Sequence, residues 1–511
     1  MRPFSTTPPA AMVLLVISLG LEAGAVHAAP TPAPQDIDPR PPVVHTPPKS
    51  DFEPRRHERA IEHSKPRPLA TGAIATDWPR FLGPTGDGHS PETPINKTLP
   101  EDHGPLKPLW ELRRGSGYAA PAVAGRHMVY THRLADEVIV ECLHPETGRQ
   151  YWSFKYPSDY RDRYGYNNGP RANPLIDDGR VYVYGVQGQL HCLDLATGTP
   201  IWSRQLQDEF DIDPTFFGIG TSPVVEGDLL VLNLGAPRFQ SKAGKGAAVA
   251  AFDKRTGRLR WHSGDHWGPS YASPLVATIH GRRRLLVLGG ADSRPPSGGL
   301  LMLDPATGKA FFHHPFRSET YESVIASNPV VVGNEVFITA SYDTGSALLR
   351  IGADGAATPV WTNPSLGAHM NTLLHHEGQL YGFDGRNERD AQLVCIDWKT
   401  GEQRWATELV WDETLLIRGK PVPQRMGTFR GSLMRVDGAF LCLGEAGHLL
   451  WLELTPKGHR VLGRSRLFLA RETWGLPVLS RGLLYVCQNT PDLIDRTPER
   501  LLCYDLRGER P

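Results

Sequence analysis

The sequence predicts an all-β fold built from eight copies of one four-stranded unit. The first observation is a recurring motif: a small residue, any residue, Asp, two residues, Thr-Gly, three residues and Trp. It is clearest in CLDLATGTPIW, and its motif glycines follow one another at steps of 46 to 59 residues. This period is typical of the blades of a β-propeller, so we expect eight blades. The eight copies, three of them weaker, lie at 142–152, 192–202, 251–261, 302–312, 351–361, 395–405, 452–462 and 503–509.

Each motif predicts a hairpin turn between two strands. The run before Asp194 alternates apolar and polar residues, as a half-buried strand does. Asp194 and Thr197 can hydrogen-bond the turn backbone, and Gly198 can supply the positive φ that a tight turn needs. Trp202 then has a fixed place on the returning strand, where its ring can fill the gap between neighbouring sheets.

Each unit is expected to begin with a short inner strand, often introduced by Ser-Pro or Asn-Pro. The last unit ends in CYDLRGERP and has no strand carrying a Trp. A stretch before the first complete unit, PLWEL at 108–112, has no unit of its own. We therefore predict that this N-terminal strand, with Trp110, completes the C-terminal blade at 475–506, closes the ring and removes its sheet edges.

The residues before the repeats predict export. Residues 1–28 have the pattern of a signal peptide, with an apolar run at 11–21 and a small-x-small site that places cleavage after Ala28. Residues 29–76 are Pro-rich and charged, and we expect a disordered linker there. Residues 77–511 then form the propeller domain.

Composition restricts the classes of partner and the location. Lys plus Arg and Asp plus Glu both total 55, so no basic excess predicts a nucleic-acid partner. After the signal peptide no apolar run reaches the roughly 18 residues of a membrane-spanning helix. The sequence therefore predicts a soluble periplasmic or secreted protein.

Six cysteines in an exported chain raise the question of disulfides. Four of them occupy the same small-residue position in four different units, and the other two lie in second strands of adjacent units. Facing sheets stack about 10 Å apart, whereas a disulfide needs Cα atoms within about 7 Å. We expect buried thiols at Cys142, Cys192, Cys395, Cys442, Cys487 and Cys503.

The repeated motif resembles the tryptophan-docking repeat of the pyrroloquinoline-quinone-type propellers. DWPRFLGPTGDGHSPE, which begins at Asp77, and the stretch 167–198 resemble one branch, the exported bacterial quinone-binding-like propeller repeat proteins. The resemblance covers residues 77–510 and implies an eight-bladed propeller. It is specific for the fold and much less specific for activity.

Two relatives with defined roles are implied by this resemblance. Quinoprotein dehydrogenases use an adjacent Cys-Cys ring, a Trp floor and acidic and Asn ligands to calcium. This sequence has neither an adjacent Cys pair nor a Cys-x-x-Cys-His haem attachment, so pyrroloquinoline quinone with calcium is not favoured as a cofactor. The second relative is the propeller lipoprotein of the outer-membrane barrel assembly machine, a scaffold. This chain lacks its lipidated Cys, since no Cys precedes Cys142.

No catalytic or metal-binding residue is assigned from the sequence. The tandem histidines at 313–314 and 375–376 are neighbours on strands or loops, and neighbouring strand residues point to opposite faces. An acidic cluster could bind calcium through hard oxygens, but it lacks a defined loop pattern, which favours a solvated inter-blade loop. That cluster consists of Asp208, Glu209, Asp211 and Asp213.

The loops that join one blade to the next should gather around one mouth of the channel. Arginines there could hold an anion, with aromatic rings as stacking walls. The alternative is that these side chains satisfy inner-strand backbone groups and fill the channel. The loops also contain Tyr164, Asn168, Phe217, Trp267 and His369. The candidate ligand-binding residues are Arg171, Asn173, Tyr271, Asn328, Asn371, Arg430 and Trp474.

Arg171 is the best single candidate for ligand contact. A buried guanidinium cannot lose its charge and needs an acidic partner or a bound anion. No acidic residue lies within five positions on either side. We predict that Arg171 points into the channel mouth; the competing interpretation makes it a clamp on neighbouring carbonyls.

The sequence thus favours an exported, non-catalytic propeller that binds an envelope protein or a small ligand at its channel mouth. The alternative is a quinone- and calcium-dependent dehydrogenase. Fold alone does not choose between them.

Overall fold

The computed structural model describes residues 41–45, 52–100, 104–212, 216–234, 248–264, 270–290, 297–321, 323–386 and 391–509. All of these residues belong to one compact unit, Pro34–Pro511. The expected signal peptide at 1–28 lies outside the described residues.

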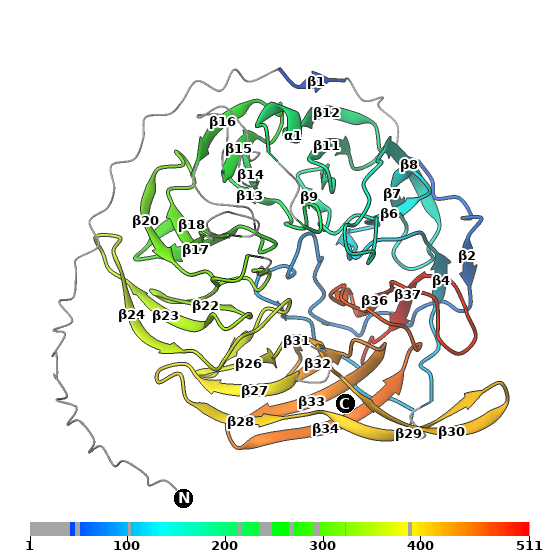
Figure 1. Ribbon diagram of the computed structural model, residues 1–511. Helices are drawn as coiled ribbons and strands as arrows, with labels where there is room; N and C mark the ends of the chain where they lie inside the picture. The colour runs from blue at the N-terminus through cyan, green and yellow to red at the C-terminus, as the bar shows by residue number, and fades with distance from the viewer. Residues whose placement is uncertain are drawn as a thin grey trace, which may run out of the picture. The chain divides into compact units, whose positions relative to one another are not determined.

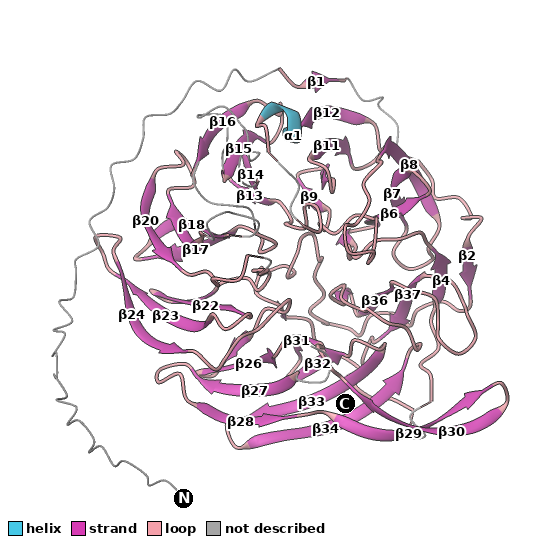
Figure 2. Cartoon of the chain, in the orientation of Figure 1, coloured by secondary structure: helices cyan, strands magenta, loops and turns pink. Residues whose placement is uncertain are grey.

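Eight antiparallel four-stranded sheets form a ring of blades (Figures 1 and 2). The chain builds each blade from its inner strand outward, as the repeat predicted. Blades 1 and 2 are β5 (Ala122–Ala124), β6 (His127–Leu134), β7 (Glu137–Leu143), β8 (Gln150–Pro157), and β9 (Leu175–Asp177), β10 (Arg180–Tyr184), β11 (Gln189–Asp194), β12 (Pro200–Gln205). Blades 3 and 4 are β13 (Val224–Glu226), β14 (Leu229–Asn233), β15 (Val249–Asp253), β16 (Leu259–Ser263), and β17 (Leu275–Ile279), β18 (Arg282–Gly289), β19 (Gly299–Leu303), β20 (Ala310–Pro315).

The second half of the ring repeats this order. Blades 5 and 6 are β21 (Val330–Val332), β22 (Glu335–Ala340), β23 (Gly345–Ile351), β24 (Ala357–Asn363), and β25 (Leu374–His376), β26 (Gln379–Asp384), β27 (Gln392–Asp397), β28 (Gln403–Thr407). Blade 7 is β31 (Ser432–Val436), β32 (Ala439–Leu443), β33 (His448–Thr455), β34 (Gly458–Arg466). Blade 8 joins β35 (Val478–Ser480), β36 (Leu483–Gln488) and β37 (Arg500–Asp505) to the early strand β4 (Trp110–Arg113).

The ring closes through β4, as predicted. β4 pairs antiparallel with β37, with Trp110 opposite Cys503 and Leu112 opposite Leu501. The strand before the first blade therefore supplies the outer strand that the last blade lacks. Closure of this kind leaves no inter-blade gap between the two ends of the repeat array.

The motif Trp and the motif Gly are two halves of one contact between neighbouring blades. Trp202 donates its indole N–H to the carbonyl oxygen of Lys254 in the next blade, at 3.2 Å. Gly257 has φ +70°, and a Cβ there would lie 2.6 Å from the Trp202 ring. The same indole bond recurs from Trp110 to Pro145 (2.9 Å), Trp152 to Leu195 (2.8 Å), Trp261 to Pro305 (3.1 Å), Trp361 to Trp398 (2.9 Å) and Trp405 to Thr455 (2.8 Å).

The motif Asp and Thr hold the turn that presents this Gly. Both the backbone N–H and the hydroxyl of Thr197 donate to Asp194 Oδ1, each at 2.9 Å. Asp253 with Thr256 and Asp304 with Thr307 repeat the arrangement. The expected turn is confirmed.

Blade 7 has no motif Trp, and a segment before β4 takes its place. The backbone N–H of Asn96 donates to the carbonyl oxygen of Leu506, at 2.8 Å. The Leu99 side chain lies beside Gly463 on the outer strand of blade 7. The junction between blades 7 and 8 is therefore sealed by residues near 95–99 in place of an indole ring.

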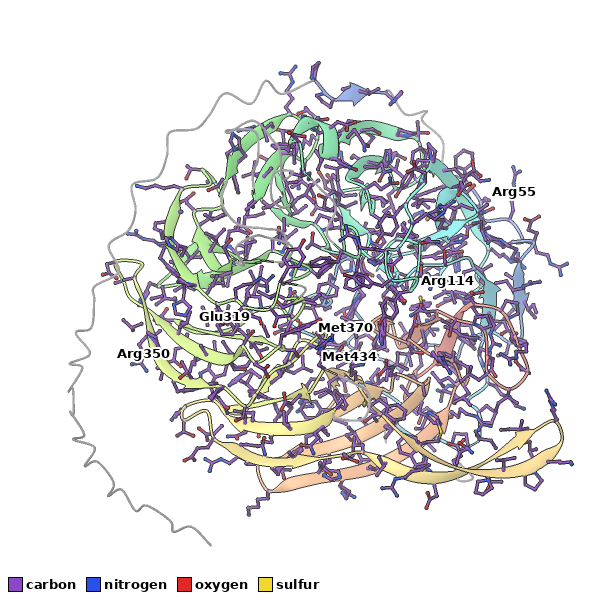
Figure 3. The ribbon with its side chains drawn as sticks, viewed as in Figure 1. Arg55, Arg114, Glu319, Arg350, Met370 and Met434 are labelled. Atoms are coloured by element: carbon purple, nitrogen blue, oxygen red, sulfur yellow. The ribbon has the colours of Figure 1, made fainter. Side chains whose placement is uncertain are left out.

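The expectation of a disordered linker at 29–76 is wrong for the part of it that the structure describes. β1 (Val43–Val44) pairs with β12, Arg55 forms a bridge with Gln150 in β8, and β2 (Ala60–Glu62) pairs with β4. Figure 3 shows Arg55 at the outer edge of the ring and Arg114 near its inner side. These residues have no core of their own, but they supply backbone partners to the free outer edges of three successive blades.

A buried carboxylate anchors this segment to blade 1. Glu141 accepts hydrogen bonds from His57 Nε2 (3.1 Å) and Arg59 Nη2 (2.7 Å), and also from the Tyr130 hydroxyl and His132 Nε2 (3.2 Å). His57 was expected in a solvated tether, yet its side chain is 3% exposed. Burial acts to raise the pKa of Glu141, but the hydrogen bonds from His132 and His57 outweigh it and hold that pKa well below its usual range.

A second early segment, residues 76–92, crosses the inner ends of the blades. Trp78 exchanges two backbone hydrogen bonds with Val123 of blade 1, and Pro79 accepts one from Ile176 of blade 2. β3 (His89–Ser90) pairs in parallel with β31 of blade 7. Glu92 is buried and accepts from the backbone N–H groups of Arg481 and Gly482 in blade 8. In Figure 1 this blue segment passes through the middle of the ring.

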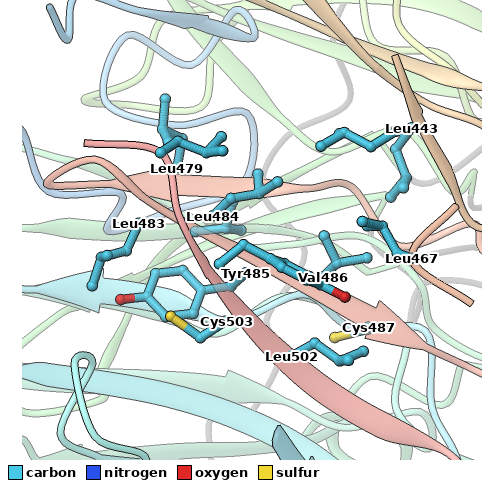
Figure 4. Packing of buried hydrophobic residues seen from close by; sticks show 14 of the residues in the cluster. Leu443, Leu467, Leu479, Leu483, Leu484, Tyr485, Val486, Cys487, Leu502 and Cys503 are labelled. Atoms are coloured by element: carbon cyan, nitrogen blue, oxygen red, sulfur yellow. The ribbon is translucent and has the colours of Figure 1, made fainter. Parts of the chain in front are cut away.

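The core consists of side chains packed between neighbouring sheets. In the last blade, Leu483, Tyr485 and Cys487 alternate with Leu484 and Val486, and all five are buried (Figure 4). All six cysteines are free and buried, so the expectation of unpaired thiols is confirmed. Burial raises the pKa of Cys192 to about 12 and that of Cys395 to about 11, which keeps these thiols protonated.

A short helix and a hairpin are inserted between blades of the repeat. The short helix α1 (Leu206–Glu209) follows blade 2. A hairpin of β29 (Val410–Ile417) and β30 (Lys420–Gly427) is inserted between blades 6 and 7. In the described part of the chain, no helix is long and apolar enough to cross a bilayer.

Candidate functional site

The ring has one face formed by the inter-blade loops and an opposite face crossed by residues 76–92. Four antiparallel strands return the chain to the side on which a blade began, so all loops between blades lie together. Asp77 accepts from the backbone N–H of Gly125, in the first turn of blade 1, so residues 76–92 lie on the opposite side. The loop side is therefore the face on which the sequence placed its candidate site, and we call this face the mouth.

The Ser and Asn residues before the inner-strand prolines, and Thr372 at the equivalent position of blade 6, link neighbouring blades. Each side-chain oxygen accepts the backbone N–H of the corresponding residue one blade earlier, which explains the recurring Ser-Pro and Asn-Pro. Five bonds join six blades: Ala120 to Asn173 (3.0 Å), Asn173 to Ser222 (2.9 Å), Ser222 to Ser273 (2.9 Å), Ser273 to Asn328 (3.0 Å) and Asn328 to Thr372 (3.1 Å).

Three of the candidate ligand-binding residues therefore carry structural hydrogen bonds. The side-chain oxygens of Asn173 and Asn328 belong to this inter-blade series. Asn371 donates its amide hydrogens to the carbonyl oxygens of Arg430 (3.1 Å) and Gly431 (2.7 Å), which ties blade 6 to blade 7. These contacts are the backbone-satisfying role that the sequence left open as the alternative.

Arg171 is held inside its own loop. Its guanidinium pairs with Asp162 at 2.6 Å and donates to the carbonyl oxygens of Asn167 (2.7 Å) and Gly169 (3.0 Å). The Arg171 side chain is 9% exposed and that of Asp162 is fully buried. This geometry is the clamp on neighbouring carbonyls that the sequence left open as the alternative. The acidic partner, Asp162, lies nine positions before Arg171, outside the window of five positions that contains no acidic residue.

Arg430 and Trp474 meet at a second ion pair. Arg430 contacts Glu445 through Nε (3.1 Å) and Nη2 (2.5 Å), and its guanidinium lies 5.1 Å from the Trp474 ring centre. Trp474 donates its indole N–H to the same carboxylate at 2.6 Å. The charge of Arg430 is therefore neutralised at the mouth.

Aromatic rings from successive loops line the mouth between these two ion pairs. Trp474 contacts Tyr118 and Tyr166, with ring centres 5.1 and 5.7 Å apart, and Tyr166 contacts Phe217 at 5.9 Å. Phe217 in turn contacts Tyr164 and Tyr271. We call this set the aromatic arc: Tyr118, Tyr164, Tyr166, Phe217, Tyr271 and Trp474.

The aromatic arc offers accessible ring surface. Tyr164 and Tyr166 are 44% and 51% exposed. Tyr271 is held by its hydroxyl, which accepts the backbone N–H of Phe217 at 2.9 Å. Tyr118 and Tyr166 were missed in the sequence; the pair of tyrosines in YGYNN, in a loop between two blades, was the available signal.

Glu472 is a second carboxylate, besides Glu445, in contact with the arc. It accepts the Tyr118 hydroxyl at 2.5 Å, and its backbone has φ +58°. Burial raises the pKa of Glu472; the bond from Tyr118 acts to lower it, and the charge of Glu445 acts to raise it. A non-glycine residue in the left-handed region costs of order 1 kcal/mol or more and is common in functional loops.

The mouth residues do not fit a quinone held by calcium. Two carboxylates of the mouth, Asp162 and Glu445, are each paired with an arginine, which opposes cation binding there. In the acidic cluster that the sequence offered as a calcium site, Glu209 pairs with Arg204, and Asp213 lies outside the described residues. The loop residue Trp267 also lies outside them. Across the described ranges, no three His, Cys, Asp or Glu side chains are grouped so that they could hold a metal ion.

Comparison with known proteins agrees with the fold. A family model described as "Outer membrane protein assembly factor BamB" matches residues 135–407, more than half of the chain. The chain therefore belongs to this family of pyrroloquinoline-quinone-type propeller repeats.

Its relatives carry names of two kinds. It is 23% identical to a quinoprotein ethanol dehydrogenase of Pseudomonas aeruginosa over 50% of this chain and 41% of that protein. It is 25% identical to the outer membrane protein assembly factor BamB of Burkholderia pseudomallei over 55% of this chain and 67% of that protein. The chain thus spans less than half the length of the dehydrogenase.

A solved structure supports the fold alone. The quinohemoprotein alcohol dehydrogenase of Comamonas testosteroni superimposes with a TM-score of 0.52 at 14% identity, covering 85% of this chain and 81% of that one. The propeller is shared, while the relatives' names leave the activity of this chain open.

Proposed function

We propose that this chain is an exported propeller repeat protein that binds an envelope protein or a small ligand at its channel mouth without catalysing a reaction. The aromatic arc carries this proposal, because exposed tyrosines and a tryptophan supply contact area with little loss of side-chain entropy. Arg171 and Arg430, beside the arc, are each paired with a carboxylate, which favours a binding role over a catalytic one. The similarity to BamB, an assembly factor by name, supports a binding role.

The proposal includes a location at the cell envelope. A signal peptide at 1–28 would be cleaved after Ala28, leaving a periplasmic or secreted protein whose propeller begins at residue 77. Mass spectrometry of the mature N-terminus tests this directly. A mature protein that still begins with Met1 would contradict it.

In-cell cross-linking tests the binding role. A photo-reactive amino acid is placed at Tyr166 in the aromatic arc and, as a control, at Arg350, which is exposed on blade 5 far from the mouth (Figure 3). We expect a discrete cross-linked partner or a small-molecule adduct from position 166 and none from position 350. The same products from both positions, or none from position 166, would overturn the proposal.

A quinone- and calcium-dependent dehydrogenase is the second candidate, favoured by the similarity to quinoprotein ethanol dehydrogenase. The test is to add pyrroloquinoline quinone and calcium to the protein with its propeller, residues 77–511, and the native segment that precedes it. A quinone absorption band, a higher melting temperature and alcohol-dependent dye reduction would place this candidate first. The absence of all three would leave the binding role.

A further inference from the structure

The hairpin of β29 and β30 stands apart from the eight blades. It is inserted between blades 6 and 7, and its tip extends beyond the ring (Figure 1). Arg418 and Gly419 form a two-residue turn with φ of +52° and +75°. Such a turn fixes the register of the two strands.

The register places two prolines on the outward edge of β30. Ile417 and Lys420 flank the turn and form the hydrogen-bonded pair, so pairing alternates from there. Pro421 and Pro423, opposite Leu416 and Thr414, occupy non-hydrogen-bonded positions. Any N–H at these positions would point away from β29, and proline has none. The outer edge of β30 is therefore blocked to further strands.

The outer edge of β29 is not blocked in this way. Its outward-facing positions are Val410, Asp412, Thr414 and Leu416, and each keeps its backbone N–H. In the part of the chain that the structure describes, β30 is the one strand paired with β29. All four side chains are exposed, Leu416 to 63%.

The alternate side chains hold β29 rigidly against the propeller. Glu413 contacts His448 Nε2 at 2.9 Å and Arg466 Nη1 at 2.5 Å. Leu415 is buried against Met426 and Leu469. A strand fixed on one face and free along one edge is preorganised to accept another strand, because little ordering is needed on binding.

The same molecule already uses strand addition at its rim. β1 adds to β12 and β2 adds to β4, in both cases as an antiparallel strand on the outer edge of a blade. An extended segment that buries few side chains of its own is thus a suitable partner for an exposed strand edge of this protein.

From this geometry we propose that β29 is a docking edge for an extended peptide of a partner protein, which pairs with it as a third, antiparallel strand. Alternating apolar side chains on the peptide would lie beside Thr414 and Leu416, and a basic residue beside Asp412. A second copy of this chain is a poorer occupant, because one short strand edge buries far less than the roughly 1,200 Å² of a stable interface.

Fluorescence anisotropy tests the proposal with the full chain. The probe is a labelled ten-residue peptide of alternating valine and threonine with one central lysine. Thr414→Pro removes an outward N–H from β29, and Arg425→Pro removes the matching N–H from the edge of β30. We expect Thr414→Pro to weaken binding about tenfold or more and Arg425→Pro to leave it unchanged.

Any of three binding results would overturn it: no binding of the probe, equal binding to the wild type and Thr414→Pro, or a loss of binding in Arg425→Pro alone. Wild-type dimers that Thr414→Pro dissociates in sedimentation would assign the edge to a second copy and also overturn it. Melting curves check folding. If Thr414→Pro lowers the melting temperature, Leu416→Pro at the next outward position replaces it.

Discussion

The indole ring of Trp202 lies against Gly257 of the next blade, where a Cβ would approach it to 2.6 Å. The Trp202 N–H also binds the carbonyl oxygen of Lys254, three residues before that glycine. Side-chain packing and a hydrogen bond thus act on the same turn. The indole bond recurs at six blade junctions in the described residues and helps to join the hairpin units into one closed structure.

Replacement of Gly257 by Ala should destabilise the propeller by about 2 kcal/mol or more, because a Cβ adds a steric clash to the cost of φ +70°. Gly227→Ala is the matched control, since Gly227 has φ +58° and no heavy atom lies within 4 Å of the point that its new methyl group would occupy. We expect Gly227→Ala to cost about 1 kcal/mol. Thermal unfolding measures both, and equal losses would contradict the docking role of Gly257.

Replacement of Glu141 by Gln should destabilise the protein by about 3 kcal/mol at neutral pH, because it breaks a buried charge pair with Arg59. The folded-state pKa of Glu141 is lowered, so its stabilisation is complete above the unfolded pKa and is lost as pH falls below that value. The wild-type melting temperature should therefore fall more steeply than that of Glu141→Gln below about pH 4.5. Parallel pH profiles would contradict this assignment.

His57→Ala should release residues 52–62 from the rim without unfolding the blades. His57 is buried against Glu141, whereas the side chain of His63, which contacts Glu111, is 40% exposed. Hydrogen exchange at the amides of β2 should accelerate in His57→Ala and change little in His63→Ala. Unchanged exchange in His57→Ala would mean that β2 is held by its pairing with β4 alone.

Arg171→Met should lower stability by about 3 kcal/mol, because it leaves the fully buried Asp162 without its cation. Arg161→Met is the control: Arg161 pairs with Asp136, and both side chains are more than 60% exposed, so its loss should cost at most about 1 kcal/mol. Denaturant unfolding compares the two. A stable Arg171→Met protein would restore Arg171 as a candidate for ligand contact.

The blade count and the closure could be predicted because they depend on local patterns. Asp194, Thr197 and Gly198 act within one turn, and the alternation of strand residues reports burial directly. The unmatched strand at Trp110 and the missing strand in the last unit are also visible without coordinates. Local hydrogen bonding and periodicity are properties of the chain itself.

The candidate site depended on distances between side chains, which the spacing of residues along the sequence does not give. Asn173 and Asn328 were expected to bind a ligand at the mouth. Their side-chain oxygens instead accept backbone N–H groups of the preceding blade, which only the packing of neighbouring blades brings within reach. Arg171 pairs with Asp162 of its own loop because that loop folds back on itself. The ring contact of Tyr118 and Trp474 likewise joins loops that are more than 350 residues apart in the chain.

By itself, the sequence determined the all-β repeat, the eight units, the strand that closes the ring and the unpaired cysteines. The tertiary structure alone decided that residues 52–62 are ordered, which glycine each tryptophan contacts and which edge of the inserted hairpin is free. The physical reason is that these contacts need surfaces created by folding. Unpaired outer strands, adjacent blades and a mouth exist only once the ring has closed, so the local patterns of the sequence do not specify which side chains will lie against them.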